Sequence, residues 1–157
     1  MRRFISSLTL VLAGIVFFSA HNAFAQKKMK KEPVMWAAEN IKWEQMKDAP
    51  SGVMSATLWG DMTKGGYGAF VKFPADIKHP LHTHSSDLKT VILSGTFTYA
   101  PEGSEVKSYG TGSYILIPGG SKHITGSGAD GCTFFMEQPG KFDMVPVEMK
   151  KDEMMKK

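Results

Sequence analysis

Three histidines, two close together and the third about 40 residues further on, most constrain how this chain can fold. His82 and His84 are separated by one residue within a β-like run, so both imidazoles point to the same side of a strand. His123 follows a Pro-Gly-Gly turn, and antiparallel hairpins between the two motifs would return it to the same place. Three converging neutral imidazoles suit a divalent transition metal such as zinc, iron, manganese, nickel or copper. The pattern therefore predicts a mononuclear metal site inside a small β-barrel.

Short apolar runs punctuated by Gly, Pro, Asp and Ser follow one another after Gly52. A spacing of roughly ten residues, with β-branched and aromatic content, is typical of an antiparallel sandwich or barrel. Asp130-Gly131 and Gly119-Gly120 are predicted turns, and no convincing helix-period stretch occurs between residues 53 and 145. We therefore expect an all-β domain. The expected strands lie near residues 53–59, 67–73, 88–100, 113–117, 122–126 and 132–138.

The N-terminal 25 residues have the three parts of a signal peptide. Met1-Arg2-Arg3 supplies a short basic region, residues 4–20 are almost wholly apolar, and Ala23-Phe24-Ala25 offers small residues where a signal peptidase requires them. A permanent membrane anchor is the alternative, but the apolar run is short and is interrupted by serine and threonine. We expect cleavage before Gln26, export to a bacterial periplasm, and no stable membrane anchor after cleavage.

The expected organisation has four parts: a signal peptide (1–25), an N-terminal lead-in (26–52), a barrel (53–148) and a charged tail (149–157). Cleavage leaves 132 of the 157 residues, which suits one domain with a sizeable core. The leader carries two arginines and no acid, so the formal net charge falls from +4 to +2. The remaining lysines gather mostly near the two ends, without an aromatic and basic stripe, so we expect no nucleic-acid binding. The lead-in is expected to lay an edge strand or a turn of helix over the barrel.

The single cysteine and the 11 methionines are ordinary on the sequence alone. Cys132 cannot form an intrachain disulfide and lies in an apolar run, which favours a buried, inert thiol over a fourth metal ligand or a redox group. The methionines are scattered or belong to the charged tail, without a tight Met-x-x-Met or Met/His cluster. We interpret them as packing and tail composition.

The second histidine motif resembles that of the cupin superfamily, G-x5-P-x-G-x2-H-x3-N. Gly112, Pro118, Gly120 and His123 occupy its positions, and only the last departs, with Ser127 in place of asparagine. The first cupin motif, G-x5-H-x-H-x3or4-E-x6-G, is matched by the two earlier histidines and by a correctly spaced glycine at position 95. The match covers roughly residues 67–138. This resemblance implies an RmlC-like double-stranded β-helix, or jelly-roll barrel.

The glutamate of the first cupin motif is missing from this chain. Its position falls on Leu88, or on Lys89 in the longer spacing, and neither can be a carboxylate ligand. Asp87 lies one residue earlier and is the obvious substitute, although side-chain alternation turns it to the other face unless a bulge intervenes. Asp87 therefore remains a candidate metal ligand, with a contact to an imidazole or a solvent-facing position as alternatives. The first glycine of the motif is also absent, since Asp76 occupies its place.

Further fragments resemble an uncharacterised branch of cupins akin to the zinc-binding cupin half of certain anti-sigma factors. That branch implies a metal-holding barrel without a settled reaction, and only its histidines carry over. The fragments are Trp59-Gly60-Asp61, Tyr67-Gly68-Ala69-Phe70, His82-Thr83-His84-Ser85 with Asp87, and Ser94-Gly95-Thr96-Phe97.

Three neutral histidines without a carboxylate do not compensate the charge of a divalent ion such as zinc, iron or manganese. The open coordination positions of that ion therefore favour a small anionic molecule. His79 precedes a proline and is expected at the surface, while Glu137 and Gln138 are candidate general bases or substrate-binding groups.

Two functions remain open. One is a metal-dependent enzyme, an oxygenase or an isomerase; some cupin dioxygenases also use three histidines. The other is a non-catalytic periplasmic metal- or ligand-binding or sensor module. Because dimers are common among cupins, the resemblance also implies that a homodimer can form.

Overall fold

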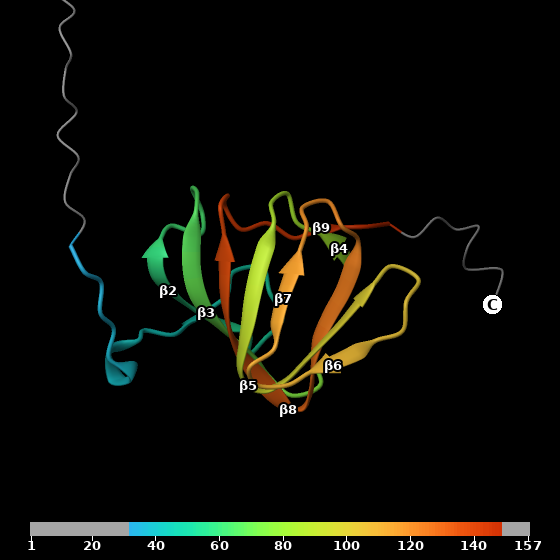
Figure 1. Ribbon diagram of the computed structural model, residues 1–157, viewed down its shortest axis with the longest axis horizontal. Helices are drawn as coiled ribbons and strands as arrows, with labels where there is room; N and C mark the ends of the chain where they lie inside the picture. The colour runs from blue at the N-terminus through green and yellow to red at the C-terminus, as the bar shows by residue number, and fades with distance from the viewer. Residues whose placement is uncertain (1–31, 149–157) are drawn as a thin grey trace, which may run out of the picture. The chain divides into compact units, whose positions relative to one another are not determined.

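The described part of the chain is built almost wholly from antiparallel strands (Figure 1). The computed structural model describes residues 32–148, so the predicted signal peptide and charged tail lie outside the described residues. Across this range, no helix is long and apolar enough to cross a membrane. The elements are η1 (Ala38–Asn40), a 3-10 helix, and the strands β1 (Glu44–Gln45), β2 (Met54–Gly60), β3 (Tyr67–Phe73), β4 (Lys78–Thr83), β5 (Leu88–Pro101), β6 (Lys107–Tyr109), β7 (Tyr114–Ile117), β8 (His123–Gln138) and β9 (Val145–Pro146).

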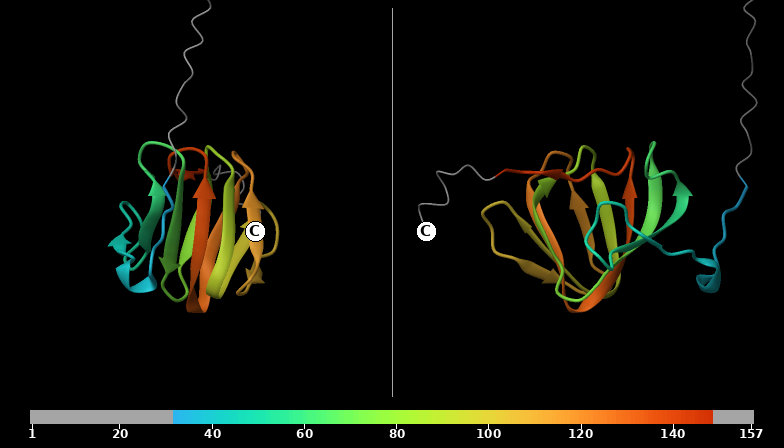
Figure 2. Two further views of the ribbon diagram at one scale, coloured as in Figure 1. Left: turned by 60° about the vertical axis from the view of Figure 1, so that its left-hand side comes forward. Right: turned by 180° about the vertical axis from the view of Figure 1, so that it is seen from behind.

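The longest strand, β8, holds the sheet together. Its first half pairs with β4 and its second half with β3, while β5 runs antiparallel to it along most of its length. The order β1-β2-β3-β8-β4-β9 follows from these pairings, with β6 and β7 joined through β5. Because one strand has three neighbours, the sheet curls back on itself (Figures 1 and 2). This arrangement confirms the predicted all-β class.

A bend in β8 replaces the turn predicted at Asp130-Gly131. Gly131 lies inside the strand with a φ of 64°, and Gly95 on the paired strand β5 has a φ of 71°. The register between the two strands shifts on either side of Gly95, so a bulge bends the pair without separating it. A Cβ on Gly95 would lie 2.2 Å from the carbonyl oxygen of Gly131. Glycine is therefore needed for the strands to cross this closely.

The inward-facing side chains form one apolar core. The alternation of buried and exposed residues along β5 and β7 is that of a sheet with one wet face. Full burial of each large apolar side chain contributes about 1.5–3 kcal/mol. The core includes Tyr67, Val71, Ile92, Phe97, Ile117 and Phe134.

The lead-in contributes both η1 and the short edge strand β1, which pairs with β2. Trp43 stacks on Phe70 of β3 at a centroid distance of 6.5 Å, and the Nζ of Lys72 lies 3.9 Å from the Trp43 ring centroid. This aromatic and cation–π contact fastens the lead-in to the outer face of the sheet. The connection from β1 to β2 then crosses the barrel, as the rear view in Figure 2 shows. It reaches the cavity described below.

Candidate metal centre

Three buried imidazoles meet where β4 ends and β8 begins. His82 lies on β4 directly opposite His123, the first residue of β8, and His84 follows immediately after β4. One nitrogen of each of the three side chains lies within 4.8 Å of the corresponding nitrogens of the other two. The structure thus brings together the three histidines that the two sequence motifs contribute. Such mutual spacing suits ligands that share one metal ion of about 2 Å bond length.

Backbone carbonyls fix the orientation of all three rings. The Nδ1 of His82 lies 2.7 Å from the carbonyl oxygen of Pro80, and the Nδ1 of His123 lies 2.8 Å from that of Ser121. The carbonyl of Asp143 makes the equivalent contact with His84. A carbonyl only accepts hydrogen bonds, so each Nδ1 carries the proton and each Nε2 carries a lone pair. The Nε2 atoms of His82 and His123 are buried without any hydrogen-bond partner. These orphaned lone pairs fit a bound metal ion.

The electrostatic surroundings keep the three rings neutral. Burial lowers the pKa values of His82 and His84, and it lowers the pKa of His123 to about 4. The backbone hydrogen bonds at Nδ1 oppose this effect, but desolvation is the larger cause in each case. At neutral pH the lone pairs are therefore available to a metal without prior loss of a proton.

Asp87 lies outside this histidine group, and Leu88 faces the cavity in its place. The Asp87 side chain is exposed, and its Oδ1 accepts a hydrogen bond of 2.9 Å from the backbone N–H of Gly119. It thereby ties the loop after His84 to the Pro-Gly-Gly turn. Leu88, at the position of the missing glutamate, is only 7% exposed and lines the cavity. The alternation of β5 turns Leu88 inward and its predecessor outward.

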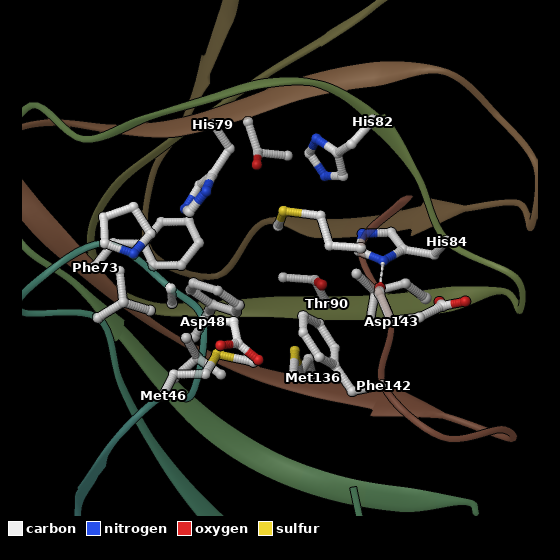
Figure 3. A pocket seen from close by; sticks show the side chains of 18 of the residues that line it. Met46, Asp48, Phe73, His79, His82, His84, Thr90, Met136, Phe142 and Asp143 are labelled. Atoms are coloured by element: carbon white, nitrogen blue, oxygen red, sulfur yellow. Dashed lines mark hydrogen bonds between the residues drawn. The ribbon is translucent and has the colours of Figure 1, made fainter. Parts of the chain in front are cut away.

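A cavity of about 380 Å³ adjoins His82 and His84 (Figure 3). This volume lies near the lower end of the range for small-molecule sites, roughly 300–1,000 Å³. Its walls come mainly from apolar side chains on β3, β5, β7 and β8. The exposed residues that line it all lie in two segments, 46–50 and 142–146, which therefore form its mouth. Besides His82 and His84, the residues that line the cavity include Val53, Val71, Phe73, Leu88, Phe97, Ile117, Phe134, Met136 and Phe142.

Comparison with known protein families identifies the family of this chain. The family model described as a domain of unknown function, DUF4437, matches residues 20–145, most of the chain. The chain belongs to the DUF4437 family. A search of curated proteins gives no match.

Solved structures show that the fold of this DUF4437 member is the cupin double-stranded β-helix. The polyketide cyclase RemF from Streptomyces resistomycificus is 18% identical with a TM-score of 0.61, covering 79% of this chain and 89% of its own. An RmlC-like cupin protein from Ralstonia eutropha JMP134 is 18% identical with a TM-score of 0.57, covering 80% and 83%. The DMSP lyase DddQ from Ruegeria pomeroyi DSS-3 is 18% identical with a TM-score of 0.56. The match covers 68% of this chain and only 61% of the length of the lyase. None of the three is an anti-sigma factor, so that part of the resemblance gains no support.

His79 is buried rather than exposed, contrary to the expectation from sequence. Its ring packs against Phe73 at a centroid distance of 4.8 Å and lines the cavity. His79 and His82 are separated by an odd number of positions, so regular alternation would turn them to opposite faces. The pairing of β4 with β8 shifts register between them, in a stretch that contains Pro80, which lacks an N–H to donate. This irregularity brings both rings inside, and the proline is the only sequence signal for it.

No sequence motif predicts several of the residues that line the cavity. Met46, Met136 and Met144 come from three distant segments and surround the cavity with thioethers, although they form no cluster in the sequence. Thr90 of β5 also lines the cavity and is almost fully buried. Only the folded topology brings these residues together.

The remaining candidates from the sequence have structural partners. Gln138 is fully buried; its Nε2 donates to the Ser86 carbonyl at 3.1 Å, and its Oε1 accepts from the Tyr67 hydroxyl at 3.0 Å, which anchors the loop after His84. Glu137 faces outward and pairs with Lys89 at 3.2 Å. The Cys132 thiol is buried in the apolar core, where desolvation raises its pKa to about 12. A thiol held in this state is a poor nucleophile.

Proposed function

We propose that this protein is a metal-dependent enzyme of the cupin fold, an oxygenase or an isomerase that acts on a small anionic molecule. One divalent transition metal would be held by the Nε2 atoms of His82, His84 and His123. The observation that carries the proposal is the pair of orphaned, buried Nε2 atoms beside a third imidazole whose Nδ1 is likewise held by a carbonyl. A polar atom that is buried without a partner is costly unless a ligand satisfies it.

The donor set supports an open rather than a closed metal centre. Leu88 takes the place of the motif glutamate, and both Asp87 and Cys132 are engaged elsewhere. Three neutral ligands leave the charge of the ion uncompensated and leave positions free for an anionic oxygen. The ion would supply Lewis-acid or redox chemistry to that oxygen.

The chain itself supplies binding and exclusion of water. The apolar walls next to the histidines surround the bound molecule and lower the local dielectric, which strengthens electrostatic contacts to the ion. The carbonyls of Pro80, Ser121 and Asp143 hold the imidazoles in one tautomer throughout. RemF and DddQ are named as a cyclase and a lyase, which shows that one fold hosts different reactions and does not choose among them.

A non-catalytic metal- or ligand-binding sensor is the second candidate. The observation that favours it is that no buried carboxylate is found among the described residues that line the cavity. Among the described residues that line it, the two carboxylates, Asp48 and Asp143, lie in the mouth segments, and neither is buried.

Cleavage before Gln26, a periplasmic location and a homodimer also stay predictions.

The proposal is tested by elemental analysis of residues 26–157 purified without an affinity tag or chelator. We expect about one equivalent of metal, lost on substitution of any of the three histidines by alanine. Asp87→Ala is the matched control and should retain the metal, because that carboxylate lies outside the histidine group. Normal metal content in all three histidine variants would refute the site.

The identity of the metal then separates the two functions. Redox-active iron, manganese, nickel or copper leads to oxygen-consumption assays with small enediols, thiols and diketones. Tightly held zinc without turnover of any such compound favours the sensor. Circular dichroism of each variant shows whether its β-structure is retained.

A further inference from the structure

Two more buried polar atoms in the same cavity have no partner, and the metal does not account for them. Among the described residues, four buried side-chain nitrogen or oxygen atoms lack a hydrogen bond. Two are the Nε2 atoms of His82 and His123, and the other two are His79 Nε2 and Thr90 Oγ1. His79 is 4% exposed and Thr90 is 1% exposed, and neither belongs to the group that could share a metal ion.

Thr90 is out of place as a core residue. Its neighbours on the inward face of β5 are Leu88 and Ile92, both apolar and buried. Valine has almost the same shape as threonine and would fill this position without burying a hydroxyl that has nothing to bind. A threonine here lowers stability in the empty cavity, so the hydroxyl has a use that packing does not supply.

His79 and Thr90 reach the cavity from different strands. His79 comes from β4, with its ring centroid 6.4 Å from that of His82, and Thr90 comes from β5, where it pairs with Met136 of β8. Figure 3 shows both side chains around the space that His82 and His84 also face. Much of the remaining lining is provided by phenylalanine, valine and methionine side chains. Among the described lining residues, Thr125 is the other buried polar side chain besides the histidines and Thr90.

We propose that His79 and Thr90 bind the ligand of this site away from the metal, and that the ligand is a small carboxylate with a ring-sized apolar body and a hydroxyl group. The inference rests on the proposed function, in which the carboxylate takes the open face of the ion. The apolar, phenylalanine-rich walls fit a ring. A hydroxyl both donates and accepts, so it can pair with a threonine hydroxyl or with a neutral imidazole.

The test compares two probes, 4-hydroxyphenylacetate and phenylacetate, by titration calorimetry on the metal-loaded protein. They differ only in the hydroxyl. We expect wild type to bind the hydroxylated probe roughly three- to tenfold more tightly, the worth of one or two modest hydrogen bonds. Thr90→Val and His79→Phe should lose part or all of this preference while still binding phenylacetate. Thr90→Ser keeps a hydroxyl and should keep the preference, as should the control Thr57→Val on the exposed side of β2.

A second measurement tests whether the Thr90 hydroxyl has a purely structural role. Without a probe, Thr90→Val should unfold at the same temperature as wild type or higher, because no hydrogen bond is lost. A lower unfolding temperature would mean that the hydroxyl has a partner within the protein, and would overturn the proposal. So would equal affinity of the two probes for wild type, or failure of both to bind metal-loaded protein. Absence of metal in wild type would instead refute the proposed function.

Discussion

One side chain, Leu88, sets the charge of the candidate metal centre. It stands where the motif has glutamate, it is buried, and it faces the cavity next to His82 and His84. With leucine there, an ion held by His82, His84 and His123 would have only neutral protein ligands, which would leave room for an anionic ligand. The same substitution spares the empty protein from burying a negative charge.

Restoring the carboxylate should therefore tighten metal binding and weaken the empty protein. We expect Leu88→Glu to raise metal affinity at least tenfold, since a negative ligand is added to three neutral ones. The metal-free variant should lose about 3 kcal/mol of unfolding free energy because the carboxyl group is desolvated. Competition with a chelator measures the first effect and denaturant unfolding the second.

The control for this prediction is Leu116→Glu on β7, where leucine is 48% exposed. Neither metal affinity nor stability should change there by more than about 0.5 kcal/mol. Equal metal affinity in Leu88→Glu and wild type would show that the side chain at this position does not reach the ion.

Among single residues, those with a fixed spacing could be predicted from the sequence. The three histidines were found because alternation and a turn motif place them on one face. His79 was misplaced because its inward position depends on a register shift in the stretch around Pro80, which alternation does not describe. The role of Thr90 could not be foreseen, because it depends on the absence of any partner in three dimensions.

At the scale of elements, the bend shared by β5 and β8 lets one strand serve both halves of the barrel. Gly95 and Gly131 both have positive φ where the two strands cross. His123 pairs with β4 before the bend, whereas Phe134 and its neighbours pair with β3 after it. The bend thus links the metal centre to the wall of the cavity.

Alanine at Gly95 should break this close contact. Its Cβ would fall 2.2 Å from the Gly131 carbonyl oxygen, and its φ of 71° is unfavourable for any residue with a Cβ. We expect Gly95→Ala to lower the free energy of unfolding by about 3 kcal/mol, measured by denaturant unfolding. Gly103→Ala separates the two causes, because its φ is 75° but nothing lies within 4 Å of the added carbon. It should cost about 1 kcal/mol, and equal losses would contradict the steric argument.

The strands themselves were largely predictable, and their connections less so. Runs of apolar and β-branched residues located β2, β3, β5 and β7 to within one residue. The two runs predicted at 122–126 and 132–138 are one strand, because Asp130-Gly131 forms a bulge in a paired strand rather than a free turn. Turn propensity alone does not distinguish these cases, since both require a glycine with positive φ.

At the scale of the whole molecule, burying several neutral imidazoles makes folding depend on pH. Burial holds the pKa of His79 and that of His123 at about 4, below the ordinary value of 6.5, and lowers those of His82 and His84 as well. Below pH 6.5 the unfolded chain therefore binds protons that the folded, metal-free protein does not. Stability is fully present above about pH 6.5 and falls as the pH drops toward 4.

We expect the unfolding free energy of the metal-free protein to decrease steadily from pH 7 to pH 5, as measured by denaturant unfolding with a chelator present. His79→Phe removes one of the titrating groups, so its pH dependence should be shallower than that of wild type. A flat profile for wild type over this range would contradict the burial of neutral imidazoles. Identical slopes for the two proteins would remove His79 from the explanation.

The two mouth segments of the cavity have a consequence for how the protein can diversify. Residues 46–50 precede the barrel strands and residues 142–146 follow β8, whereas the three histidines belong to β4, its end, and β8. Changes in the mouth segments alter what enters without moving the carbonyls that hold His82 and His123. The exception is the carbonyl of Asp143, which holds His84 and lies in a mouth segment. A laboratory that randomised only the two mouth segments would search ligand preference while keeping most of the metal-binding chemistry fixed.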